Sequence, residues 1–379
     1  LMDRAPPPGH NRGRIARRAP LRIGDMPGPA GEHGYHQHFD DAITPAAMHA
    51  YYASIPVRAE GCAQCAPLED LAVFTASGAD ALSFLHGQLT QDVTGLPQDA
   101  ARLAGYCTAK GRLLATMVMW RGAGDTDDAP QFYGLVRQDL SQALIKRLSM
   151  FVLRAKAKLA AAPLHVAGVQ ATPEQAAALE AVAGALPRAT WQRADLPSGT
   201  WIVAPSADDR LRWWWIASDE QLAQSAALTQ ALGLASAQQW QAADLAAGIP
   251  WIAAATQDVF IPQTVNLDLI QGVSFTKGCY PGQEVVARSH YRGTVKRRMA
   301  FGTVADVSLQ GPALTGVDVF DATQPGEAIG RVVQAASDAG VVSVLFETTL
   351  AALPEGDLRL ASADGPRIAP APLPYAINP

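Results

Sequence analysis

The sequence is poor in cysteine and in charge and has no long apolar run, and each shortage excludes a class of protein. Its 379 residues include four cysteines, fewer than a secreted disulfide-stabilised chain of this size would carry. Charged residues make up 17%, and the net charge of −5 argues against a chain-wide nucleic-acid surface but not against a local basic patch. No run of about 18 apolar residues occurs, and the N-terminus lacks the apolar core of a secretory signal. We therefore predict a soluble, cytoplasmic protein with no membrane partner.

The rest of the composition is that of a globular protein with more than one domain. One hydrophobic core rarely grows beyond about 250–300 residues, so the length predicts two or three domains. We predict a disordered leader over residues 1–45, two α+β subdomains over 46–290 and a C-terminal β-barrel over 291–375. The leader contains His33, His36 and His38, but no ordered cysteine or carboxylate is predicted beside them, so we predict no metal site.

The first ordered stretch combines apolar strands with helices, which predicts an α+β unit with an antiparallel sheet. A helix should start at Asp139, with Gln142 placed for a capping box. Short apolar runs and the intervening turns predict strands at 71–75, 103–107, 113–120 and 132–136.

A second α+β stretch and a β-rich end follow. Thr172-Pro173-Glu174-Gln175 and Ser218, with Gln221 three residues on, predict two further helix starts. Beyond Arg298 the helical spacing nearly disappears, which predicts a small β-barrel. Strands are predicted at 201–204, 213–216, 299–304, 330–333 and 340–345.

The segment around Cys279 is the densest in chemistry. Gly278 and Gly282 bracket the cysteine, Pro281 stiffens the loop, and nearby cations favour the thiolate, which is the reactive form. Such a thiol is a nucleophile, a metal or cluster ligand, or a redox group; the alternative is a buried, inert cysteine. The cations nearby in the sequence are Lys277, Arg288, Arg292, Lys296, Arg297 and Arg298.

The other cysteines predict less. Cys62-x-x-Cys65 has the spacing of a redox motif or of half a zinc site, but Pro67 breaks any following helix and no second pair exists. We predict neither function for this pair. Cys107 is expected in the core of a strand.

The run Lys277-Gly278-Cys279-Tyr280-Pro281-Gly282-Gln283-Glu284 closely resembles the signature of the YgfZ family, relatives of the T protein (aminomethyltransferase) of the glycine cleavage system. Flanking pieces agree, including Tyr291-Arg292-Gly293, Ala109-Lys110-Gly111-Arg112 and the closing Pro372-Leu373-Pro374-Tyr375. The resemblance covers about residues 66–375. It implies a ring-like aminomethyltransferase fold with a C-terminal β-barrel, and tetrahydrofolate in the central hole.

The resemblance also implies a role and a set of site residues. The family supports the assembly or repair of iron–sulfur clusters, including those of enzymes that thiolate tRNA, and this role depends on the signature cysteine, here Cys279. Trp240 matches a tryptophan that packs on the pterin, while a second such position falls on Leu71. The remaining predicted folate-binding residues are Lys277, Tyr280, Gln283, Glu284, Arg288 and Arg292, the arginines being suited to carboxylates.

One departure separates this chain from the aminomethyltransferases. Where they carry an aspartate pair after a turn glycine, the matching run here ends in Ala115 and Thr116. Without a carboxylate to assist proton transfer at the folate, aminomethyl transfer is disfavoured.

Three hypotheses follow. The first is a folate-binding accessory factor for iron–sulfur proteins or their assembly factors, in which Cys279 holds a transient cluster or a one-carbon adduct. The second is a folate-dependent one-carbon transferase. The third is an RNA-binding protein that uses the basic segment 288–298, although no RRM or KH signature occurs and direct nucleic-acid contact is not expected.

Overall fold

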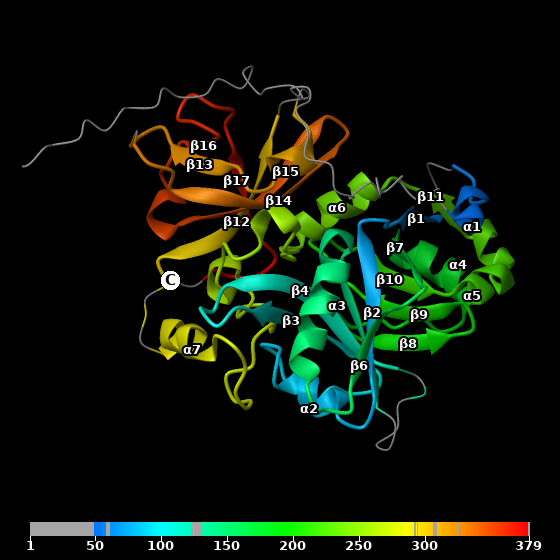
Figure 1. Ribbon diagram of the computed structural model, residues 1–379. Helices are drawn as coiled ribbons and strands as arrows, with labels where there is room; N and C mark the ends of the chain where they lie inside the picture. Colours follow the sequence, from blue (N-terminus) through cyan, green and yellow to red (C-terminus); the bar gives the residue numbers. More distant parts are fainter. Residues whose placement is uncertain are drawn as a thin grey trace, which may run out of the picture. The chain divides into compact units, whose positions relative to one another are not determined.

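The computed structural model describes residues 49–57, 61–122, 124, 130–291, 293, 295–305, 309–324 and 326–377 (Figure 1). The predicted leader and its three histidines lie outside these residues. Residues 47–379 form one compact unit, and the predicted division at residue 290 stays a prediction. No helix among the described residues combines the length and the apolar character needed to cross a membrane.

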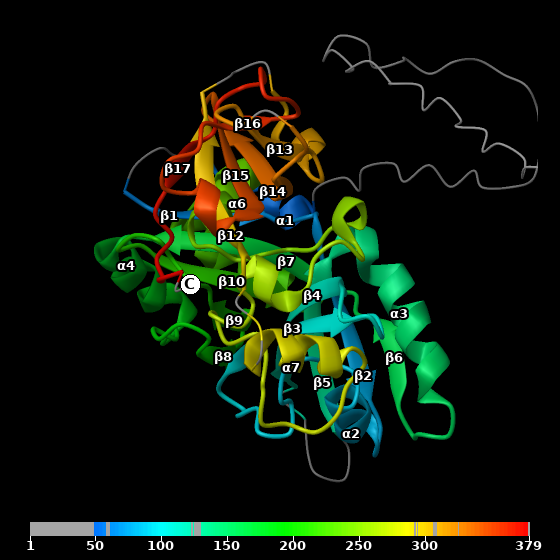
Figure 2. The ribbon, with the colours of Figure 1, turned by 90° about the vertical axis from the view of Figure 1, so that its left-hand side faces the viewer.

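The first sheet is antiparallel and has the strand order β3-β4-β5-β2-β6. The four strands predicted in this stretch are confirmed. Helix α3 packs along β2 and β6, as Figure 2 shows. The elements are β2 (Leu71–Ser77), α2 (Ala81–His86), β3 (Ala101–Cys107), β4 (Leu113–Arg121), β5 (Gln131–Arg137), α3 (Gln138–Val152) and β6 (Lys158–Ala161).

The predicted capping box of α3 is wrong. Strand β5 runs directly into the helix, so that Arg137 is the N-cap and no side chain caps the first turn. Asp139 instead accepts a hydrogen bond from the backbone N–H of Ala254, 3.0 Å away. Arg137, the last residue of β5, pairs at 2.5 Å with Asp70, which directly precedes the neighbouring strand β2.

The second sheet has the order β11-β1-β7-β10-β9-β8, in which only the β1–β11 pair is parallel among the described strands. Both capping boxes predicted here are confirmed, at Thr172 and Ser218. The elements are α1 (Ala50–Ala53), β1 (Ala63–Pro67), β7 (His165–Ala171), α4 (Pro173–Ala183), β8 (Arg193–Leu196), β9 (Gly199–Val203), β10 (Leu211–Ala217), α5 (Asp219–Gln224), β11 (Leu232–Leu234) and α6 (Ala237–Ala246).

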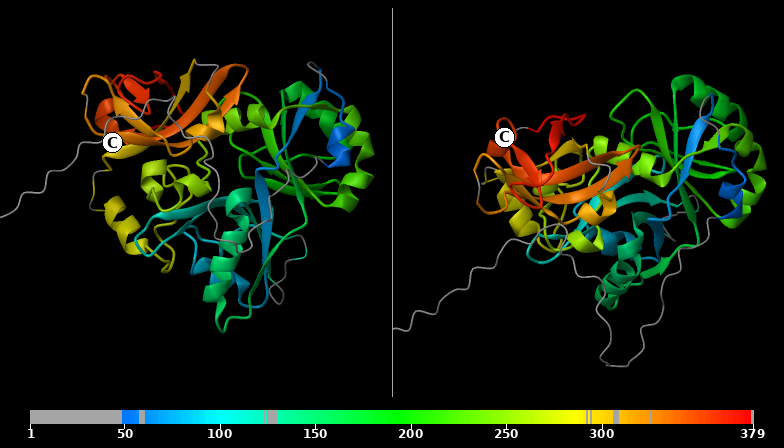
Figure 3. Two further views of the ribbon diagram at one scale, coloured as in Figure 1. Left: turned by 45° about the horizontal axis from the view of Figure 1, so that its top comes forward. Right: turned by 90° about the horizontal axis from the view of Figure 1, so that it is seen from above.

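The third sheet is antiparallel, with the order β16-β13-β14-β15-β12-β17, and confirms the predicted C-terminal β-structure. Its strands β14 and β15 lie beside α6, as Figure 3 shows. The strands are β12 (Arg297–Val304), β13 (Asp318–Asp321), β14 (Gly330–Asp338), β15 (Val341–Thr349), β16 (Leu358–Leu360) and β17 (Ala369–Ala371). Helix α7 (Gln283–Tyr291) and 3₁₀ turns at Ala226–Gln230, Ala254–Thr256, Pro262–Val265, Gly311–Leu314 and Leu350–Ala352 complete the described elements.

Candidate functional site

Cys279 is exposed, whereas the other three cysteines, all within the described residues, are buried. Burial raises the pKa of the Cys107 thiol to about 12 and raises that of Cys65 as well. A high pKa keeps a buried thiol protonated and inert. Cys279, in the loop just before α7, is therefore the accessible thiol of this chain.

Lys277 is the cation that the fold holds next to this thiol. Its ammonium group donates to the carbonyl oxygens of His86 and Leu89 and lies 4.8 Å from the centre of the Tyr280 ring. The side chain is nearly buried, and this burial lowers the pKa of Lys277 to about 8, against the charges of Asp92 and Cys279, which raise it. Lys277 thus remains mostly protonated at pH 7 and places a positive charge beside Cys279.

Two glycines fix the signature segment to the rest of the molecule. Gly282 and Gly111 both have positive φ, at 82° and 73°, and a Cβ on Gly282 would come within 2.6 Å of the Gly111 Cα. Only glycine allows this backbone approach. Gln263 then donates to the Val286 carbonyl oxygen at 2.7 Å, which anchors α7.

The other predicted signature residues do not gather around one cavity. Glu284 and Arg288 form an ion pair on the solvent face of α7, at 3.2 Å and with 86% and 69% of the side chains exposed. Tyr280 is buried against Lys277, and Gln283 is half-buried at the start of α7. Arg292 lies outside the described residues.

An aromatic cavity of about 240 Å³ lies where the second sheet, the loop after α6 and the C-terminal tail meet. Trp191 and Gln271 both line it with positive φ, at 69° and 61°, a strained conformation that persists only where the surroundings impose it. Tyr375 closes one side and donates to the Gly248 carbonyl oxygen at 3.0 Å. The lining residues are Thr190, Trp191, Pro205, Ser206, Ala247, Ile249, Leu269, Ile270, Gln271, Pro374 and Tyr375.

Trp240 lies behind this cavity rather than in its wall. It is 2% exposed, and the Arg212 guanidinium covers its ring at 4.0 Å. Trp240 packs edge-on against Trp214, which in turn stacks on Trp191 with ring centres 5.9 Å apart. Direct contact of a pterin with Trp240 would need Arg212 to move, whereas Trp191 is already at the cavity. Sequence patterns missed Trp191, whose only signal is an isolated tryptophan in a loop.

Leu71 occupies the second position at which the family carries a pterin-packing tryptophan. It is a buried residue of β2 and lines no described cavity. The site where aminomethyltransferases carry carboxylates is also closed. Ala115 is buried, and the Thr116 hydroxyl donates to the Pro250 carbonyl oxygen at 2.7 Å while it accepts from the Ile252 N–H. Thr116 therefore has a structural role in this chain.

The aromatic cavity and the thiol are joined by one short stretch of chain. Gln271 at the cavity rim begins the loop that reaches Cys279, and the segment before β3 holds both ends of that loop. Thr90 donates to the Gly272 carbonyl oxygen at 2.7 Å, and the Leu89 carbonyl accepts from Lys277 at 2.9 Å.

One cluster among the described residues offers metal-ligating atoms. Nε2 of His165 lies 2.6 Å and Nε2 of His49 lies 3.4 Å from one oxygen of Asp219. The Nδ1 of His49 accepts the N–H of Tyr51, so that its Nε2 carries the hydrogen in the neutral ring. As arranged, the His165 imidazole is hydrogen-bonded to the carboxylate, and the His49 imidazole lies within ion-pair distance of it.

Comparison with known proteins gives the class and then the family. The solved structure of the glycine cleavage system aminomethyltransferase T from Bartonella henselae has a TM-score of 0.59 to this chain at 15% identity, covering 86% of this chain and 88% of that one. The chain thus has the aminomethyltransferase fold, as predicted.

Curated relatives named tRNA-modifying protein YgfZ are 33% identical over 247 residues (Serratia proteamaculans) and 35% identical over 241 residues (Edwardsiella ictaluri). Each match covers 61% of this chain and 68% of the relative. No protein-family model matches. The chain belongs to the YgfZ family, which confirms the resemblance drawn from its signature.

Proposed function

We propose that this chain is a tetrahydrofolate-binding accessory protein that supports iron–sulfur cluster assembly or repair through Cys279, with an indirect effect on tRNA modification. The observation that carries the proposal is the exposed Cys279 thiol beside Lys277, on a loop that starts at the aromatic cavity. Relatives named as tRNA-modifying proteins support the tRNA link. The chain's cytoplasmic location stays a prediction.

The aromatic cavity suits the pterin end of a folate. Its volume of about 240 Å³ is below the usual range of about 300–1,000 Å³ for whole-ligand pockets, so it fits one ring system rather than a complete folate. Trp191 and Tyr375 supply aromatic surface, and Thr190, Ser206 and Gln271 supply polar groups for the ring nitrogens. The lining has no charged residue, so the glutamate end would extend toward solvent.

Cys279 would act as a ligand or nucleophile outside that cavity. A thiolate donates its lone pair to iron without any change in oxidation state, and a single thiolate leaves the other cluster ligands to a partner protein. Lys277 holds the negative charge in place by electrostatic attraction. The cluster is cargo in this scheme and need not be resident.

The alternatives find less support. The hypothesis of a one-carbon transferase requires a carboxylate at the positions that Ala115 and Thr116 occupy. The hypothesis of an RNA-binding protein requires cations between residues 288 and 298 that are available to phosphate groups. Arg298 is buried in a pair with Asp268, and the carboxylates of Glu284 and Glu347 offset part of the charge of Arg288 and Arg297.

Isothermal titration with tetrahydrofolate tests the ligand. Trp191→Ala should weaken binding about ten-fold, because one aromatic contact and its stacking are lost, while Trp191→Phe should restore most of it. Trp240→Ala should weaken binding less, through Trp214. If Trp191→Ala binds as well as the unchanged chain, the folate does not occupy this cavity.

Replacement of the thiol tests the second half of the proposal. Cys279→Ala should leave tetrahydrofolate affinity within about two-fold, because the residue does not line the cavity, yet abolish support of cluster-containing enzymes in a deletion strain. Cys107→Ala is the matched control, since that thiol is buried. Full activity of cluster enzymes with Cys279→Ala would refute the assigned role.

A further inference from the structure

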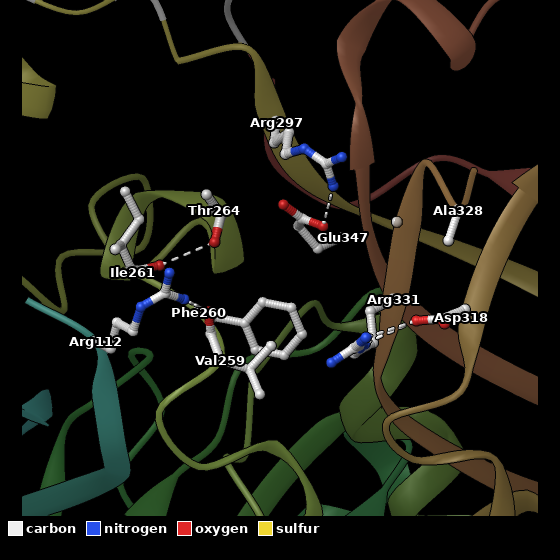
Figure 4. A pocket seen from close by; sticks show the side chains of 11 residues that line it. Arg112, Val259, Phe260, Ile261, Thr264, Arg297, Asp318, Ala328, Arg331 and Glu347 are labelled. Atoms are coloured by element: carbon white, nitrogen blue, oxygen red, sulfur yellow. Dashed lines mark hydrogen bonds and ion pairs between the residues drawn. The ribbon is translucent and has the colours of Figure 1, made fainter. Parts of the chain in front are cut away.

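A second cavity, of about 440 Å³, shares no lining residue with the aromatic cavity. We call it the arginine cavity. Its walls come from the turn before β4, from residues 259–264 and from strands of the third sheet (Figure 4). The lining residues are Arg112, Val259, Phe260, Ile261, Thr264, Arg297, Asp318, Ala328, Gly330, Arg331 and Glu347.

Three guanidinium groups from separate segments reach this cavity. Arg112 enters from one side and Arg331 from the other, with Arg297 at a third position, as Figure 4 shows. Arg112 is exposed, and the partner of its guanidinium among the described residues is the carbonyl oxygen of Val259. A guanidinium has five N–H donors, so most of those on Arg112 remain available to a ligand.

The two carboxylates of the cavity do not cancel this charge. Arg297 pairs with Glu347 at 2.9 Å and Arg331 with Asp318 at 2.8 Å, which leaves a formal charge of +1. Glu347 is 8% exposed, and burial raises the pKa of its carboxyl against the pull of Arg297 and Arg331. Arg297, Arg331 and Asp318 are about two-fifths exposed, so a ligand can reach them.

The ligand that meets these conditions is an organic phosphate. A phosphate monoester carries about two negative charges near pH 7 and offers three acceptor oxygens, which guanidinium groups approaching from different directions can share. A carboxylate has a single charge and a planar pair of oxygens, and the cavity already supplies such groups to two of its arginines. The volume leaves room for an organic body along the wall formed by Val259, Ile261 and Ala328.

We propose that the arginine cavity binds a small organic phosphate of about nucleotide size through Arg112, Arg331 and Arg297, at a site separate from the aromatic cavity. Nothing in this proposal depends on folate binding or on Cys279.

Isothermal titration of the full chain with ADP and with inorganic pyrophosphate, at low salt, tests the proposal. Arg112→Ala and Arg331→Ala should each weaken binding about ten-fold or more, because each removes a charge-assisted contact to phosphate. Asp318→Asn should tighten binding several-fold, since it removes a competing negative charge. The matched control is Arg288→Ala, which removes an equal charge from the exposed face of α7, outside the cavity.

Further measurements distinguish phosphate binding in the arginine cavity from other causes of a titration signal. Arg112→Ala should keep its thermal midpoint and its tetrahydrofolate affinity, because Arg112 is exposed and lines the arginine cavity but not the aromatic cavity. Triglutamate should bind at least ten-fold more weakly than ADP. The proposal is overturned if neither phosphate binds, if Arg288→Ala weakens binding as much as Arg112→Ala, or if only triglutamate or tRNA binds in an Arg112-dependent way.

Discussion

Asp244→Ala should be among the most destabilising single substitutions in the part of the molecule behind the aromatic cavity. Asp244 on α6 accepts from the Arg212 guanidinium at 2.6 Å and from the Trp251 indole at 3.1 Å. The two charged side chains are 4% and 1% exposed. Removing the carboxylate leaves the Arg212 charge buried without a counter-charge, which costs about 3–5 kcal/mol. Arg212 also donates to the carbonyl oxygen of Pro205 in the cavity wall, so the cavity should loosen as well.

Urea unfolding followed by tryptophan fluorescence measures this loss. Glu284→Ala is the matched control, because it breaks an ion pair that is largely exposed and should cost about 0–0.5 kcal/mol. The double variant Arg212→Met with Asp244→Leu should recover most of the stability, since apolar residues of similar size replace the pair. A loss below about 1 kcal/mol for Asp244→Ala would show that the buried pair does not hold this region together.

Four further predictions concern the thiol, the pH dependence of stability, a helix start and a close packing contact. Lys277→Met should slow iodoacetamide alkylation of Cys279 at pH 7 about three- to ten-fold, and an unchanged rate would exclude Lys277 as the activating charge. The pKa of Lys277 is about 8 in the folded chain, compared with an ordinary value of 10.5. Between pH 8 and pH 10.5, the unfolded chain therefore retains a proton on Lys277 that the folded chain has lost. The free energy of unfolding should therefore rise with pH across that window, and Lys277→Met should lack this rise. Thr172→Ala should cost about 1 kcal/mol in urea unfolding through loss of the capping box, with no change in folate affinity. Gly168→Ala should cost about 1–3 kcal/mol, because the added Cβ overlaps the Trp240 ring; an unaffected thermal midpoint would contradict this packing.

Local features of the fold could be predicted from the sequence because local chemistry decides them. The capping boxes at Thr172 and Ser218 need only a hydroxyl and a glutamine three residues on. The strands of the first sheet follow from short apolar runs bounded by turn residues. The cap predicted at Asp139 failed because a distant N–H, that of Ala254, competes for the carboxylate. That competition is set by tertiary packing and is absent from the local pattern.

The candidate site was predicted only in part. Cys279 was singled out correctly as the accessible thiol, but the cations around it in sequence are dispersed in space. Arg298 turns inward to pair with Asp268 at 2.7 Å, and of the charged neighbours in the signature it is Lys277 that interacts with the thiol. The aromatic cavity combines residues near 190, 205, 249, 270 and 375, which no sequence spacing relates.

The loop from Gln271 to Cys279 connects the rim of the aromatic cavity to the exposed thiol. Its first part is fixed where Thr90 bonds to the Gly272 carbonyl oxygen and the Ser274 N–H bonds back to the Thr90 carbonyl oxygen, at 2.7 and 2.9 Å. Its last part is fixed where the Lys277 ammonium group bonds to two carbonyl oxygens of the same neighbouring segment. The same neighbouring segment, residues 86–90, therefore holds both the cavity end of this loop and Lys277. Since Lys277 is the cation next to Cys279, this segment also fixes the position of the positive charge beside the thiol.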